Sequence, residues 1–203
     1  MSAAPVDPIR QAKRELRAHC RRLRDDLGEA YRTQASQSIV STLAPWSPLL
    51  SARLVFTFLP MPGEVDLQSL MGLLPDVRWA IPRVVDSPAP HLVFHAYMPD
   101  RLTRHRYGML EPDPALPEIP SGEANLIIVP ALSYTRRGYR LGYGGGYYDR
   151  LLAASGLIPT VGVCFEALLL EDLPRTAHDL PVSHVVTEVQ GVIACRVEDQ
   201  QPD

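Results

Sequence analysis

The chain has little of what marks an exported or membrane-bound protein. Its 203 residues include three cysteines, Cys20, Cys164 and Cys195, which are widely spaced and lack the spacing of metal ligands. No hydrophobic run approaches the length that spans a membrane, and the first residues, MSAAPVDPIRQAKRELR, lack the apolar core of a secretory signal. We therefore expect buried free thiols, no membrane partner and a cytoplasmic location.

Strong positive charge is also missing. The formal net charge is −3, which argues against a protein that binds nucleic acid through bulk charge. Apolar residues make up 46% and charged residues 21%, the composition of an ordinary soluble globular protein. The sequence shows no internal repeat, and a chain of this length buries a sizeable core as one unit. We expect a monomer with a single domain over residues 1–203.

Two well-known nucleotide-binding fingerprints are absent as well. No string fits G-x-x-x-x-G-K-[ST], and a G-x-G-x-x-G pattern beginning at Gly142 would need glycine in place of Tyr147. The chain has instead RLGYGGGYYDR, residues 140–150, with four of its thirteen glycines. Three consecutive glycines cost backbone entropy on folding, so this stretch indicates a requirement for bare backbone.

The hydrophobic pattern predicts helices that alternate with strands. Helices are expected at Pro8 to Leu27, Glu29 to Leu43, Asp66 to Leu74 and Tyr147 to Ala154. Strands are expected at residues 53–60, 77–82, 91–98, 125–130, 160–165 and 191–194, with a further short strand within HDLPVSHVVTE (178–188). The runs LVFTF, LIIV and VGVCF are typical of strands covered on both faces. The pattern predicts an α/β fold with a largely parallel sheet, and a long surface loop at the proline-rich residues 111–120.

The first predicted helix carries a basic stripe beside its packing side. Asp7 is suited to cap this helix and Gly28 to end it. The apolar stripe consists of Ile9, Leu16, Cys20, Leu23 and Leu27. About 90° away at helical spacing lie Arg10, Lys13, Arg17, Arg21 and Arg24. Most charge runs are solvated faces. Lys13 and Arg17 nevertheless lie near the packing side, so a solvated and a functional reading both stand.

The glycine stretch is placed where anions bind. It follows a buried strand and precedes the helix predicted at Tyr147, and unencumbered amides ahead of a helix favour phosphate. Tyr143, Tyr147 and Tyr148 are able to stack on a planar ring, and Asp149 is able to hold a divalent cation. These residue types within ten positions favour a binding site over a structural turn.

Two other stretches give weaker signals. Glu64, in FLPMPGEVDL (58–67), follows a buried strand, at the edge of a parallel sheet where ligands gather. On position alone, a surface glutamate in a turn is the better reading. His178 and Asp179 resemble a metal pair, but adjacent side chains often diverge.

Taken together, these stretches resemble a known family. RLGYGGGYYDR, PMPGEVDL (60–67) and KRELR (13–17) resemble the 5-formyltetrahydrofolate cyclo-ligases, also called 5,10-methenyltetrahydrofolate synthetases. IPRV (81–84), YGMLEP (107–112) and HDLPVSHVVTE match further stretches in the same order. The resemblance runs from Lys13 to about Glu188.

The resemblance implies a reaction. Members convert 5-formyltetrahydrofolate to 5,10-methenyltetrahydrofolate with ATP and Mg²⁺, releasing ADP and phosphate. ATP phosphorylates the formyl oxygen, N10 attacks that carbon, and loss of phosphate closes the ring. Such chemistry needs positioning and charge neutralisation more than a protein nucleophile. The family's fold is a three-layer α/β sandwich, like the ribose-phosphate isomerases and CoA transferases.

The resemblance also implies residue roles. The ATP-binding residues would be Lys13, Arg14, Glu15, Leu16, Arg17, Arg140, Leu141, Gly142, Tyr143, Gly144, Gly145, Gly146, Tyr147 and Tyr148. The folate-binding residues would be Arg17, Leu59, Glu64, Tyr143, Gly144, Gly145, Gly146 and Tyr147. Asp149 and Asp179 would be the Mg²⁺ ligands, as hard oxygen donors should be.

Two departures from the family pattern matter. Some members carry basic residues within the glycine loop, where this chain has Tyr143 and Gly145. Ser183 stands where an acidic residue is common, which leaves only Asp179 nearby as a hard ligand. Two alternatives stay open: a sugar-phosphate isomerase-like enzyme without ATP, using Glu64 or Asp149 as its base, and a non-catalytic folate binder. A dead binder should have lost Lys13, Glu64 or Asp149, and all three are present.

Overall fold

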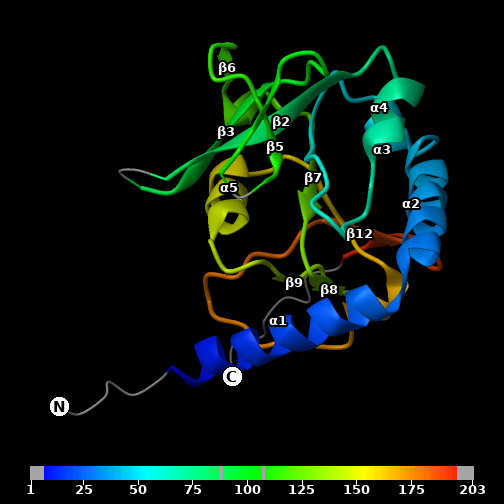
Figure 1. Cartoon of the computed structure of the whole chain (residues 1–203), viewed down its shortest axis with the longest axis vertical. Helices are drawn as coiled ribbons and strands as arrows, with labels where there is room; N and C mark the ends of the chain where they lie inside the picture. The colour runs from blue at the N-terminus through cyan, green and yellow to red at the C-terminus, as the bar shows by residue number, and fades with distance from the viewer. Residues whose placement is uncertain (1–6, 87–88, 107, 196–203) are drawn as a thin grey trace.

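An eight-stranded sheet forms the centre of the protein (Figure 1). The structure is a computed structural model and describes residues 7–86, 89–106 and 108–195. The strand order is β13-β12-β10-β7-β1-β2-β3-β6. The strands span Gly191–Ala194 (β13), His184–Thr187 (β12), Thr160–Val163 (β10), Leu126–Pro130 (β7), Leu54–Phe56 (β1), Arg78–Val85 (β2), His91–Ala96 (β3) and Glu118–Ile119 (β6).

The five central strands of this sheet are parallel and the outer pairs are antiparallel. β2, β1, β7, β10 and β12 pair in parallel, whereas β13, β3 and β6 join antiparallel at the edges. β1 and β10 are fully buried, as continuous apolar runs require. The prediction of an α/β fold with a mostly parallel central sheet is confirmed.

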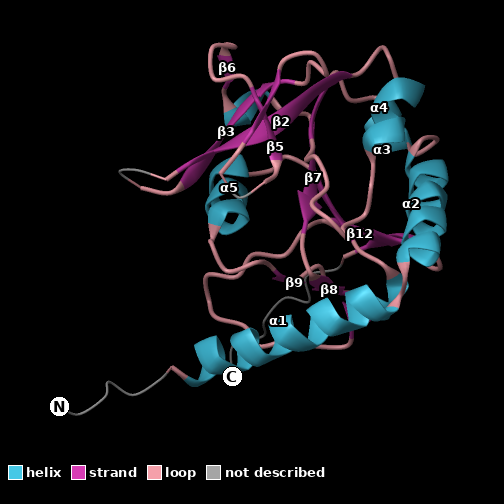
Figure 2. Ribbon diagram, viewed as in Figure 1, coloured by secondary structure: helices cyan, strands magenta, loops and turns pink. Residues whose placement is uncertain are grey.

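Helices lie on both sides of the sheet (Figure 2). α2 (Glu29–Leu43), α3 (Ser47–Leu50) and α4 (Gln68–Leu73) lie on one side, and α5 (Tyr147–Ser155) lies on the other. α1 (Pro8–Asp26) crosses below the sheet in this view. The Asp7 carboxylate caps α1 by accepting the Ile9 N–H at 3.0 Å, as predicted. The other predicted helices differ by at most two residues at an end. Within the described residues, no helix is both long and apolar enough to cross a membrane.

The strand predictions fail mainly at strand ends. The strand expected at 53–60 pairs only over Leu54–Phe56, after which the chain leaves the sheet. β2 continues to Val85 although a proline stands at position 82. Because β1 has ended by then, the missing N–H of Pro82 costs no ladder bond. Two residues on, the Val84 N–H instead donates to Glu111 Oε1 at 2.9 Å.

The structure also contains short strands that the sequence did not predict, in two small sheets beside the central one. β11 (Leu169–Leu170), β8 (Ser133–Thr135) and β9 (Arg140–Leu141) form a second sheet, and β4 (Leu102–Arg104) pairs with β5 (Leu110–Pro112). The expectation of a plain loop at 111–120 is therefore wrong in part, since β5 and β6 fall at its ends. These are edge strands of two or three residues, short enough to tolerate neighbouring prolines. Cys20 and Cys164 are buried free thiols as expected, but Cys195 is only half-buried.

At Gly162, in the central sheet, a neighbouring aromatic ring occupies the space that a side chain would need. A Cβ at Gly162 in β10 would lie 2.3 Å from Cε1 and Cζ of Tyr134, whose hydroxyl donates to the Val129 carbonyl at 2.8 Å. Gly162→Ala is expected to lower the free energy of unfolding by about 3 kcal/mol, because a fully buried ring must move. Gly72→Ala in α4, where a Cβ meets nothing within 4 Å, should instead stabilise by roughly 0.5–1 kcal/mol. Urea denaturation of both variants measures the difference; equal stabilities would contradict it.

Candidate active site

A cavity of about 370 Å³ lies between α1, the carboxyl ends of β1 and β7, the β2–β3 hairpin and the chain ahead of α5. In parallel sheets, ligands bind at this edge. The cavity is lined by Lys13, Arg17, Phe58, Leu59, Met61, Glu64, Pro82, Val84, Leu92, Met109, Leu110, Glu111, Pro130, Arg140, Leu141, Gly142, Tyr143, Gly144, Gly145, Gly146, Tyr147, Tyr148, Asp149 and Asp179. The structure thus brings together residues from seven separate stretches of the sequence.

The glycine loop, residues 142–146, forms one wall between β9 and α5. Gly144 and Gly146 have φ of 107° and 68°, values that favour glycine. Gly146 caps α5 without any side-chain hydrogen bond, so the first amides of that helix are left for an anion. The Gly142 carbonyl accepts a hydrogen bond from Arg17 Nε at 2.8 Å, and the Gly145 carbonyl accepts one from Arg150 at 2.8 Å. Cations therefore hold the loop from both sides.

Gly145 is the loop position with the least room for a side chain. A Cβ there would lie 2.6 Å from Cε2 and 2.7 Å from Cδ2 of the Tyr147 ring. If the loop binds ATP, as the family resemblance implies, Gly145→Ala is expected to raise the Kd for ATP roughly tenfold, because the loop or the ring must shift. Gly142→Ala is the matched comparison, since a Cβ there meets nothing within 4 Å, and its effect should be much smaller. Titration calorimetry with ATP checks both; equal affinities would mean that the loop does not face the nucleotide.

Two ion pairs close one end of the cavity. Lys13 Nζ lies 2.6 Å from both carboxylate oxygens of Asp179, which also accepts the Thr176 N–H at 2.6 Å. Burial alone would raise the pKa of Asp179, but the hydrogen bonds from Lys13 and Thr176 hold it below its usual value. Arg140 donates to the Leu180 carbonyl at 2.8 Å and pairs with Asp149. Both predicted metal ligands, Asp179 and Asp149, are thus paired with basic side chains.

A polar cluster marks the other end of the cavity. Glu64 accepts the Met61 N–H at 2.9 Å and a hydrogen bond from the Tyr143 hydroxyl. Burial raises the pKa of Glu64, while these hydrogen bonds and the charge of Arg24 act in the opposite direction. Burial also raises the pKa of Tyr143 and Tyr148, so both phenols stay protonated donors at neutral pH. The interpretation of Glu64 as a surface residue in a turn is wrong.

The buried carboxyl group of Glu64 is expected to lower the stability of the folded protein as pH rises. Its pKa is higher in the folded than in the unfolded chain, so raising pH above about 4 ionises the unfolded state first and lowers stability. Glu64→Gln removes the buried charge but keeps one acceptor oxygen, whereas Met61 and Tyr143 donate to different oxygens of Glu64, so one of these two hydrogen bonds is lost. We expect the thermal midpoint of the variant, relative to that of the unchanged protein, to be higher at pH 8 than at pH 4. Melting curves at the two pH values check this; a constant difference would contradict it.

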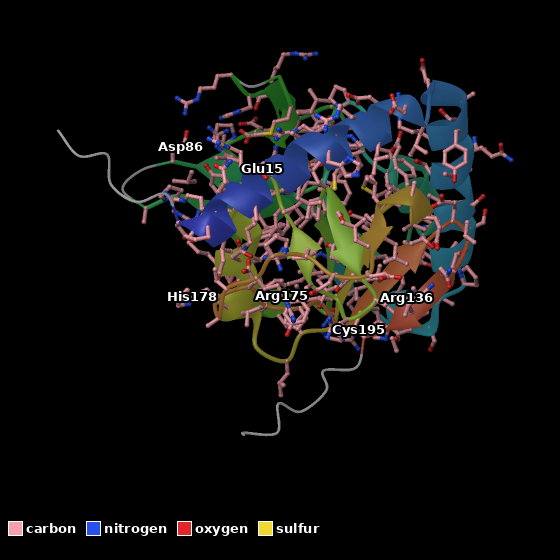
Figure 3. The ribbon with its side chains drawn as sticks, turned by 90° about the horizontal axis from the view of Figure 1, so that it is seen from below. Glu15, Asp86, Arg136, Arg175, His178 and Cys195 are labelled. Atoms are coloured by element: carbon pink, nitrogen blue, oxygen red, sulfur yellow. The ribbon has the colours of Figure 1, made fainter. Side chains whose placement is uncertain are left out.

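Several predicted site residues do not reach the cavity. Arg14 and Glu15 are exposed and hydrogen-bond to Gln11 within α1, and Figure 3 shows Glu15 on this helix. Leu16 packs against the hydrophobic core instead. Ser183 is bound to Thr160, with its Oγ donating to the Thr160 carbonyl at 2.7 Å. His178 is exposed, so it does not join Asp179 at the site.

Other lining residues were missed by sequence reasoning. Pro82, Val84, Met109, Leu110 and Glu111 come from IPRV and YGMLEP, stretches that matched the family without an assigned role. Tyr107, the first residue of YGMLEP, lies outside the described residues. Phe58, Met61, Leu92 and Pro130 gave no signal beyond their place near strand ends. Together they make one wall apolar and suited to a planar ring.

A mostly parallel sheet that opens into a cavity lined by cations and a glycine loop defines an α/β protein for anionic small molecules. Comparison with known proteins makes this specific. The model of the 5-formyltetrahydrofolate cyclo-ligase family matches residues 9–188. The chain belongs to this family of ligases.

Similar proteins agree in sequence and in structure. A 5-formyltetrahydrofolate cyclo-ligase from Mycolicibacterium smegmatis is 32% identical over 194 residues, covering 92% of this chain and 98% of that protein. The solution structure of Aquifex aeolicus 5,10-methenyltetrahydrofolate synthetase has 30% identity and a TM-score of 0.80, covering 94% of this chain and 96% of that one. The synthetase from Mycoplasma pneumoniae, at 19% identity and a TM-score of 0.71, supports the fold.

Proposed function

We propose that the protein closes 5-formyltetrahydrofolate to 5,10-methenyltetrahydrofolate with ATP, releasing ADP and phosphate. The observation that carries the proposal is that one cavity joins the glycine loop and its cations to the apolar wall with Glu64 and Tyr143. Family membership supports it. ATP and a folate need both halves in contact, because the phosphoryl group passes directly between them.

The residues divide between the two substrates. Lys13, Arg17 and Arg140 offer positive charge to the phosphates, and the amides of residues 144–147 lie at the helix end that favours anions. Leu59 and the neighbouring apolar wall cover the folate ring, and Glu64 accepts hydrogen bonds from its donor-rich edge. Tyr143 and Tyr147 stand between the two halves. Arg14, Glu15 and Leu16 have no role in this assignment, since they point away from the cavity.

In the proposed reaction the formyl oxygen attacks the γ-phosphorus and ADP leaves. N10 then attacks the formyl carbon, the carbon–oxygen bond breaks with release of phosphate, and the N10 proton is lost. The protein binds, orients and neutralises charge, and no side chain forms a bond to substrate. Where the bound substrates displace water from the partly apolar cavity, each of these charge interactions becomes stronger.

Mg²⁺ is part of the proposal. Asp149 and Asp179 supply hard carboxylate oxygens at the phosphate end, and Mg²⁺ is held typically by one or two carboxylates plus substrate phosphates. Within the described residues no three His, Cys, Asp or Glu side chains cluster as ligands, which is consistent with that sparse coordination. When bound, Mg²⁺ neutralises phosphate charge. Asp149 and Asp179 would exchange part of their contact with Arg140 and Lys13 for the metal.

Broader expectations remain part of the proposal. The helices on both sides of the sheet support a three-layer sandwich related to the ribose-phosphate isomerases and CoA transferases. We further propose one domain over residues 1–203, a monomer, and a cytoplasmic location without nucleic-acid or membrane partners.

The reaction is tested by mixing the purified protein with 5-formyltetrahydrofolate and Mg²⁺, with and without ATP. We expect the near-ultraviolet band of the methenyl product to grow only with ATP. Folate binding without any band would indicate a non-catalytic binder. Neither band nor binding would contradict the proposal and favour a phosphate-ester substrate.

A further inference from the structure

Arg24 lies in the last turn of α1, behind the folate end of the cavity. Arg24 lies eleven residues after Lys13 and seven after Arg17, so the three side chains share one face of the helix. Its Nη1 donates to the Tyr143 hydroxyl at 3.2 Å. The guanidinium packs against the backbone of the turn that carries Glu64, since a Cβ at Gly63 would lie 3.1 Å from Arg24 Nε. Arg24 does not line the large cavity, so any influence on a substrate is indirect.

The hydrogen bonds around Tyr143 have one consistent direction. A guanidinium has donors only, so the Tyr143 oxygen must accept from Arg24. The phenol proton is then free to be donated to Glu64, which is the second partner of this hydroxyl. Arg24 therefore fixes both the position of the phenol and the direction in which its proton points.

The surroundings of Glu64 contain few other charges. The titratable groups nearby are Arg24 from α1, Tyr143 from the glycine loop, Tyr148 from α5 and Cys164 after β10. Among the described residues, Arg24 is the cation whose charge lowers the pKa of Glu64. Glu64 and Arg24 also border a separate cavity of about 10 Å³, roughly the space of one water molecule. Among the described residues, the buried Nε of Arg24 finds no hydrogen-bond partner.

We propose that Arg24 is a positioning residue for the folate: it holds the Tyr143 phenol as a donor to Glu64 and places a positive charge beside that carboxylate. The inference rests on the proposed function, because it needs the folate at Glu64. The nucleotide lies at the other end of the cavity, against Lys13, Arg140 and the glycine loop. Loss of Arg24 is therefore expected to affect the folate more than the nucleotide.

The test compares Arg24→Gln and Arg24→Lys with Arg22→Gln, an exposed neutralisation two residues away on the same helix. Steady-state kinetics are measured for 5-formyltetrahydrofolate and for MgATP between pH 5.5 and 9. For Arg24→Gln we expect the KM for the folate to rise about tenfold, the scale of one charged hydrogen bond, and the KM for ATP to stay within twofold. Arg22→Gln should match the unchanged protein.

The pH profile separates positioning from simple structural damage. An ionised Glu64 is lost as pH falls, and without a neighbouring cation it is lost at higher pH. The acid limb of kcat/KM for the folate should therefore move to higher pH in Arg24→Gln and stay in place in Arg24→Lys, which keeps the charge. Equal increases in both KM values, or an unmoved acid limb in Arg24→Gln, would overturn the proposal.

A double-mutant cycle tests the route through Tyr143. If Arg24 acts in part through the phenol, Arg24→Gln combined with Tyr143→Phe should raise the folate KM by less than the two single increases multiplied together. An increase equal to that product would overturn that route. If Arg24→Gln does not fold, the same cycle with Arg24→Lys decides. Absence of turnover and of folate binding in the unchanged protein would instead reject the proposed function itself.

Discussion

Lys13→Met is expected to lower kcat for ATP-dependent turnover by about a hundredfold to a thousandfold. Methionine keeps much of the aliphatic length but removes the ammonium that lies 2.6 Å from both Asp179 oxygens. In the proposed function, the cavity then loses a cation that faces phosphate and keeps a carboxylate that repels it. Kinetics at saturating folate and varied ATP measure the loss, and thermal melting shows whether the variant is folded.

Arg14→Met gives the sharpest comparison with Lys13→Met. The family pattern, carried over residue by residue, implies that both residues contact ATP. The structure instead places Arg14 on the exposed side of α1, where it donates to Gln11 at 2.6 Å. We expect less than a twofold change in kcat, because exposed polar contacts contribute little. An equal loss in the two variants would contradict the geometry and place the nucleotide against the outer side of the helix.

Asp149→Asn is expected to reduce turnover by a similar factor of about a hundredfold to a thousandfold. The side chain of Arg140 is only 4% exposed, and its charged partner is Asp149. Asparagine keeps the shape and an acceptor oxygen but removes the charge, so Arg140 is left with neutral partners, this amide and the Leu180 carbonyl. The same change also weakens any Mg²⁺ held there.

Titration with Mg²⁺ separates these two effects of Asp149→Asn. If Asp149 helps to hold the metal, as we propose, high Mg²⁺ should restore part of the rate. If it acts only by orienting Arg140, no concentration restores the rate and Arg140→Lys shows the same defect. Full activity of Asp149→Asn at low Mg²⁺ would remove Asp149 from the site.

Local patterns in the sequence were enough to predict much of the fold. Asp7 and Gly28 bound α1 because capping and a positive φ depend on neighbouring residues alone. Buried strands such as β1 and β10 are predicted by short runs of apolar and β-branched residues. What failed was long-range: β2 continues past Pro82 only because its neighbour β1 has already ended, which no local pattern contains.

The candidate site was predictable to a different degree at each end. The glycine loop is one continuous stretch, so its lining role could be predicted from sequence alone. For α1, helical periodicity correctly set Lys13 and Arg17 apart from the outer residues, whereas the family pattern treated residues 13–17 as one block. The Tyr143–Glu64 contact joins positions 79 apart, and the Arg24–Tyr143 contact joins positions 119 apart. Such pairs depend on how the strands are ordered in the sheet.

The position of α1 in the chain also affects the order in which the contacts of the cavity form during synthesis. α1 is synthesised before the other segments that line the cavity, and its contacts with the site reach across 119, 125 and 166 residues of chain. The hydrogen bonds of Arg17, Arg24 and Lys13 to these segments therefore form only after Gly142, Tyr143 and finally Asp179 have been synthesised. Contacts of such long range slow folding, because loop-closure entropy is lost before they form. The contacts of α1 with the cavity are thus completed only once Asp179 is present, and a chain that ends before Asp179 leaves the cavity unfinished.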